Sequence, residues 1–102
     1  MPFGSFVNVL PPVVFLAVHL VAFLAGSFFA FRAFDSGASK LGWGFSLYAL
    51  GELVYMTYHL DWTVILFAHT IAEVLNLVGF SLIFLGAVQR LRSGSAAQPA
   101  RA

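Results

Sequence analysis

Residues 12–33 read PVVFLAVHLVAFLAGSFFAFRA, and Arg32 is the first charged residue in the run when histidine is neutral. A helix needs about 20 apolar residues to cross a hydrocarbon core of about 30 Å. Pro11 and Pro12 suit the start of a helix, where no internal partner for an N–H group is required. Asp35-Ser36-Gly37 breaks the pattern. The stretch therefore predicts a transmembrane helix.

Two further windows of the same kind follow along the chain. One covers about residues 41–60 and ends where Asp61-Trp62 turns the chain, and the other covers about 62–89 and ends at Gln89-Arg90. We therefore expect an all-α fold, an integral membrane three-helix bundle. Residues 1–92 would form the transmembrane domain, and 93–102, rich in Ser, Ala and Pro, a flexible tail.

The composition agrees with a chain that resides in lipid. Of the 102 residues, 61% are hydrophobic and 9% charged, and a soluble domain of this size could not hide so many apolar side chains. There is no cysteine, so thiolate metal sites and thiol catalysis are excluded. A net charge of +1 with no basic stripe gives no reason to expect nucleic acid as a partner.

Basic residues predict the orientation in the membrane. Arg32 and Lys40 flank the first loop, and Arg90, Arg92 and Arg101 follow the third window, whereas the opposite side has none. The positive-inside rule then places the amino terminus outside and the carboxyl terminus in the cytoplasm of a bacterial inner membrane, crossed several times.

Ionisable residues inside the predicted spans are the candidates for function, since each costs about 2.5–3.5 kcal/mol when charged at the centre of a membrane helix. They are His19, Glu52, His59, His69 and Glu73. With a rise of about 1.5 Å per residue, all but His59 fall about 9 to 17 Å below the outer surface. We expect them to point inward at one level, with His59 solvated near the outer interface.

Three roles remain open for these residues and their neighbours. His19 and His69 are candidate cofactor ligands for haem or a bacteriochlorophyll-type pigment. Glu52, His69 and Glu73 are candidate ligands of a divalent metal. A proton relay, or polar packing between helices, would use Glu52, Tyr55, His59, Glu73 and Asn76.

The stretches from Phe31-Arg32-Ala33-Phe34 to Gly44-Phe45 and from Leu77-Val78-Gly79-Phe80 to Phe84 resemble a three-helix unit of small uncharacterised prokaryotic membrane proteins. That resemblance implies the fold and no activity. The chain is also similar in span count and acid placement to the smallest antiporter-like subunit of respiratory complex I, and in span count and buried histidine to haem-bearing anchors of succinate dehydrogenase. It lacks the acid spacing of the first family and the arginine and histidine signatures of the second.

No catalytic arrangement of Ser, His and Asp and no phosphate-binding glycine loop occurs, so the chain is not expected to be an enzyme by itself. Three helices bury little surface, so we expect partners besides the bilayer: other membrane subunits or further copies of the chain. The leading hypothesis is a small accessory subunit of an electron-transfer or photosynthetic complex, with the His/Glu layer binding a cofactor or metal or relaying protons. The alternatives are an oligomeric ion or proton transporter and a purely structural or sensory membrane module.

Overall fold

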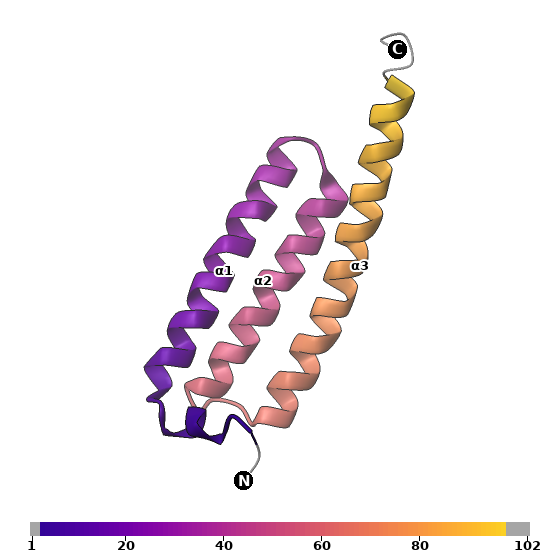
Figure 1. Cartoon of the computed structure of the whole chain (residues 1–102). Helices are drawn as coiled ribbons and strands as arrows, with labels where there is room; N and C mark the ends of the chain where they lie inside the picture. Colours follow the sequence, from indigo (N-terminus) through magenta and orange to yellow (C-terminus); the bar gives the residue numbers. More distant parts are fainter. Residues whose placement is uncertain (1–2, 98–102) are drawn as a thin grey trace.

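The computed structural model describes residues 3–97 and contains helices only in that range (Figure 1). A short 3₁₀ helix, η1, spans Ser5–Val9 and precedes three α-helices. They are α1 (Pro12–Asp35), α2 (Ser39–His59) and α3 (Ile65–Ala97). The all-α three-helix architecture predicted from the sequence is therefore confirmed.

The helix α2 lies at the centre of the arrangement. Successive helices run antiparallel, and α2 packs along both α1 and α3, which lie on its two sides in Figure 1. In the described part of the chain, α1 and α3 do not pack against each other. Side chains on α2 are thus the ones that can connect the outer two helices.

Two similar capping motifs end α1 and α2. After α1, the N–H of Ala38 donates to the carbonyl of Ala33 and the N–H of Gly37 to that of Phe34, with Gly37 at φ 81°. This is the Schellman arrangement, in which a residue with positive φ reverses the chain.

After α2 the same arrangement places Asp61, not glycine, at the positive φ of 64°. The N–H of Trp62 donates to the carbonyl of Thr57, and that of Asp61 to the carbonyl of Tyr58. The hydroxyls of Thr57 and Thr63 lie 2.9 Å apart and close the turn. The sequence correctly predicted turns at both places.

Glycine and alanine form the contacts between helices. A Cβ atom on Gly44 would lie 2.6 Å from the carbonyl oxygen of Gly79, and one on Gly79 would lie 2.8 Å from that of Gly44. On the other side of α2, Gly26 of α1 lies directly against the Tyr48 ring. Small residues thus let the helix backbones approach closely, as they do between helices in membranes.

Large apolar side chains mostly remain on the surface. The buried apolar residues in the described part of the chain are all alanines, such as Ala68 and Ala72 at 0% exposure, while Leu77 and Phe84 are more than 60% exposed. Two helices, α1 and α3, are long and apolar enough to cross a membrane. The helix α2, predicted as the span 41–60, is less apolar because Tyr, Ser, Thr, Lys40 and Glu52 interrupt it.

The end of α3 differs from the expectation. The predicted span closed at residue 89 and the predicted tail began at 93, whereas α3 continues to Ala97. Neither Ser93 nor Gly94 is sufficient to end a long helix that is already formed. The rest of the predicted tail, 98–102, lies outside the described residues.

Candidate functional site: a polar cluster across the three helices

Six polar side chains from the three helices form what we call the polar cluster. It consists of His19 of α1, Glu52, Tyr55 and His59 of α2, and His69 and Glu73 of α3. On α2 the three members are spaced by three and four residues, so they share one helix face. On α3 the two members are four residues apart, one turn along the helix.

The hydrogen bond between His19 and Glu52 is the tightest contact of the cluster. His19 Nδ1 and Glu52 Oε2 lie 2.5 Å apart, and their side chains are 20% and 11% exposed. A bond of this length holds a proton between the nitrogen and the oxygen, whichever of them carries it. The pair joins α1 to α2 and satisfies the only described carboxylate that is buried.

Aromatic stacking extends the cluster from His19 toward the end of α2. The His19 ring stacks on Tyr55 with a centroid separation of 5.0 Å and on His59 with 5.2 Å. His59 is in turn stacked on Phe15, at 5.1 Å and an interplanar angle of 5°. His59 is therefore half-buried between aromatic rings, not simply solvated at the interface as the sequence suggested.

Tyr55 connects this α1–α2 part of the cluster to α3. Its hydroxyl lies 3.3 Å from His69 Nδ1 and can donate to Glu73 Oε1 at 3.4 Å. Both contacts are at the long end of the hydrogen-bond range. His69 and Glu73 are exposed on the surface of the single chain, whereas Glu52 is buried.

A pocket of about 350 Å³ opens beside the cluster, at the end of the molecule where α2 turns into α3. Its polar lining comes from Asn8, Tyr58, His59 and Asp61. His59 thus belongs both to this pocket and to the stack on His19. Water in the pocket would have contact with one end of the polar cluster.

The candidate metal ligands are not brought together. Glu52 is bonded to His19 on the α1 side of α2, while His69 and Glu73 lie on α3. In the part of the chain that the structure describes, no three His, Asp or Glu side chains are grouped closely enough to hold a metal ion.

The candidate haem or pigment ligands, His19 and His69, contact the same residue. His19 stacks on the Tyr55 ring, and His69 Nδ1 lies near the Tyr55 hydroxyl. A group ligated by both imidazoles would have to displace Tyr55. The Nδ1 atom of His19 is also occupied by Glu52, which leaves Nε2 as its free nitrogen.

Asn76, predicted to take part in a relay or in polar packing, lies apart from the cluster. Its Oδ1 atom is buried without a hydrogen-bond partner and faces Gly51, where an added Cβ would lie 3.0 Å away. It contributes to the α2–α3 contact and has no hydrogen bond to the six cluster residues.

Sequence reasoning missed the contributions of Asn8 and Phe15, which line the pocket. Phe15 is four residues before His19, and this spacing was the available signal that both share a face of α1. Asn8 gave no signal, because its position depends on η1 folding back toward the α2–α3 turn.

Comparison with known proteins supplied no relative. No protein-family model, no curated protein and no solved structure matches this chain.

Proposed function

We propose that this chain is a membrane-embedded accessory subunit whose polar cluster relays protons. The relay would run from the pocket at His59, through His19 and Glu52, and by way of Tyr55 to His69 and Glu73 on the outer face of α3. The observation that carries the proposal is the 2.5 Å contact between His19 and Glu52, because it joins two proton-carrying groups on different helices next to a pocket-lining histidine.

Placement in a bilayer is supported by the surface of the fold. The described core contains only alanines as buried apolar residues, and bulky side chains such as Leu66, Leu77 and Phe84 are exposed. In water, this fold would expose an apolar surface far larger than the apolar patches on soluble monomers. Lipid or partner helices remove this cost, and the small-residue contacts between helices fit the same environment.

The chemistry of the cluster supports proton transfer over the other roles. Imidazole can both accept and donate a proton near neutral pH, and carboxyl groups are frequent proton carriers inside membrane proteins. Hydrogen bonds join His19 to Glu52 and Tyr55 to His69 and Glu73. Two steps of the route, from His59 to His19 and from His19 to Tyr55, are ring stacks. Water or a rotation of the imidazole rings would complete these two steps.

An accessory role is supported by where the cluster ends. His69 and Glu73 are exposed on α3, and a charged group at the centre of a membrane helix costs about 2.5–3.5 kcal/mol when it faces lipid. A partner subunit that covers this face would offset the cost and receive the proton. As the host we propose a bacterial inner-membrane complex of electron transfer or photosynthesis.

Infrared difference spectroscopy on the full chain in lipid vesicles tests the relay. Glu52→Gln and Glu73→Gln assign the two carboxyl signals, and a step into deuterated buffer measures how fast each exchanges. We expect His59→Leu to slow exchange at Glu52 by about tenfold or more, equivalent to about 1.4 kcal/mol in the barrier. Phe15→Leu is the matched control, since Phe15 lines the same pocket and stacks on the same ring but carries no proton.

Equal exchange rates in the His59→Leu variant and the parent chain would contradict the relay.

A second candidate function, transport by a homo-oligomer, is favoured by the same exposed pair on α3, His69 and Glu73, because a second copy could cover it. Proton flux through vesicles that contain only the purified chain distinguishes the two. An accessory subunit gives no net flux, and a transporter gives a flux that Glu52→Gln abolishes.

A further inference from the structure

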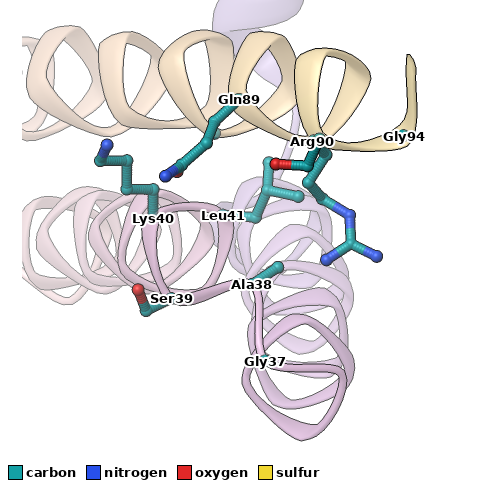
Figure 2. Close-up of a pocket in the computed structure, with 10 residues that line it drawn as sticks. Gly37, Ala38, Ser39, Lys40, Leu41, Gln89, Arg90 and Gly94 are labelled. Atoms are coloured by element: carbon teal, nitrogen blue, oxygen red, sulfur yellow. The ribbon is translucent and has the colours of Figure 1, made fainter. Parts of the chain in front are cut away.

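A second hollow lies far from the polar cluster, at the opposite end of the molecule. It has a volume of about 520 Å³ and is formed where the α1–α2 loop and the first turn of α2 meet the last turns of α3 (Figure 2). Its lining is Gly37, Ala38, Ser39, Lys40, Leu41, Gly86, Gln89, Arg90, Ser93 and Gly94.

Two cations from different helices border this hollow, which we call the basic pocket. Lys40 comes from α2 and Arg90 from α3. Figure 2 shows Lys40 and Gln89 facing each other across the space between the helices, with the Arg90 guanidinium on the other side of Leu41. Among the described residues the only ion pair is His19–Glu52, so no carboxylate there neutralises either cation.

The remaining lining adds neutral hydrogen-bond donors and a close-packed floor. The hydroxyls of Ser39 and Ser93 and the amide of Gln89 can donate to an anion. Gly86 brings α3 so near that an added Cβ would lie 3.1 Å from the backbone nitrogen of Leu41. The hollow thus lies between two helices that are closely packed at Gly86 and at the Gly44–Gly79 contact.

We infer that the basic pocket binds a phosphate group. A phosphate offers several acceptor oxygens to the ammonium of Lys40, the guanidinium of Arg90 and the neutral donors of the lining. Basic pockets between membrane helices on the cytoplasmic side are typical sites for anionic lipid headgroups. An anionic phospholipid and a soluble phosphate carry the same group, and the experiments below distinguish these two sources. The inference does not depend on the proton relay.

Native mass spectrometry of the full chain, extracted from bilayers of mixed phosphatidylglycerol and phosphatidylcholine, tests the inference. We expect the parent chain to retain phosphatidylglycerol in preference to phosphatidylcholine. The double variant Lys40→Gln/Arg90→Gln should lose about tenfold or more in this preference, because each charge-assisted bond contributes on the scale of a tenfold change in affinity.

The double variant Arg32→Gln/Arg92→Gln is the matched control. It removes the same charge from the same end of the molecule, but neither residue lines the basic pocket. It should keep the preference, and helix content by circular dichroism should be unchanged in both double variants, since all four side chains are on the surface. An equal loss in both variants would mean diffuse attraction to charge and would overturn the site.

Inorganic phosphate added to the chain in purely zwitterionic bilayers separates the two sources. Phosphate that binds the parent chain there, and not the Lys40→Gln/Arg90→Gln variant, supports a soluble ligand, whereas retention of phosphatidylglycerol in the mixed bilayers without phosphate binding supports a headgroup site. A parent chain that shows neither binding overturns the inference.

Discussion

The imidazole of His19 is the hydrogen-bond partner of a buried carboxylate, that of Glu52. Glu52 is 9% exposed, and its carboxylate is hydrogen-bonded to His19 Nδ1. A buried polar group that loses its partner costs about 1–3 kcal/mol, more than the bond itself contributes. The pair should therefore matter to stability as well as to the proposed relay.

Glu52→Leu should lower the free energy of unfolding by about 1–3 kcal/mol, because His19 is left without its partner. Glu73→Leu should have a smaller effect, since Glu73 is exposed. Thermal unfolding of the full chain in detergent measures both. The double variant His19→Phe/Glu52→Leu should recover part of the loss by removing both partners. Equal unfolding of the two single variants would show that the pair contributes no stability.

Asp61 adopts a left-handed backbone, with φ 64°, in the turn that joins α2 to α3. This conformation costs most residues about 1–2 kcal/mol, and Asp tolerates it better than β-branched residues do. Asp61→Val should therefore destabilise the chain by about 1–2 kcal/mol, and Asp61→Gly should be neutral or stabilising. The order of the unfolding midpoints checks this, and a Gly variant less stable than the Val variant would contradict the role of the backbone.

At the scale of single residues, the sequence predicted which side chains share a helix face but not which side chains of the neighbouring helices they contact. The three- and four-residue spacing correctly put Glu52, Tyr55 and His59 on one side of α2. Because α2 lies between two helices, that side borders both, and spacing alone could not say which neighbour each residue meets. The stacking of His59 on His19 depends on how far α1 is shifted along α2, which the capped turn at Gly37 determines.

At the scale of the helices, the contact of Gly44 with Gly79 holds α2 against α3. An added Cβ on Gly44 would meet the carbonyl oxygen and backbone of α3. Backbone atoms cannot rotate away as a side chain can, so a larger residue must push the helices apart. Overpacking of this kind costs about 1–3 kcal/mol.

Gly44→Ala should destabilise the chain by about 1–3 kcal/mol in spite of the better helix propensity of alanine. Gly94→Ala is the control, because nothing lies within 4 Å of a Cβ at that position. That variant should be neutral or gain up to about 1 kcal/mol. Unfolding in detergent measures both, and a stabilised Gly44→Ala variant would show that the helices are less closely packed than described.

The helix bounds were predicted well where a turn residue marks them and poorly elsewhere. The first predicted span, 12–33, falls within α1, which ends at Asp35 before the glycine of the capping motif. The third span was predicted from 62, yet α3 begins at Ile65. Trp62 and Val64 are apolar and fit a span by composition, but the left-handed Asp61 and the Thr57–Thr63 contact hold this segment outside the helix.

At the scale of the whole molecule, the central position of α2 decides how the chain could sit in a bilayer. Two helices, α1 and α3, are long and apolar enough to cross, and α2 is antiparallel to both and packed between them. If α1 and α3 cross, α2 must cross with them. Its polar residues then lie at the membrane interior, mostly against the other two helices.

A chain without cysteine allows this topology to be tested with single introduced thiols. Ser36→Cys lies in the α1–α2 loop and Thr63→Cys in the α2–α3 turn, at opposite ends of the helices. In intact bacterial cells, a membrane-impermeant maleimide should label Thr63→Cys and should not label Ser36→Cys until the cells are opened, as expected for an external amino terminus. Labelling of both thiols in intact cells would contradict three crossings.

The length of α3 has a mechanical consequence. Its 33 residues extend about 50 Å at about 1.5 Å per residue, whereas a hydrocarbon core is about 30 Å thick. Figure 1 shows its last turns continuing past the loop between α1 and α2. In a membrane those turns would stand free of the lipid as a rigid stalk that carries Arg90 and Arg92 into the aqueous phase. Trypsin added on the side of the membrane that carries Arg90 and Arg92 should cleave the stalk and leave the rest of the chain in the vesicle.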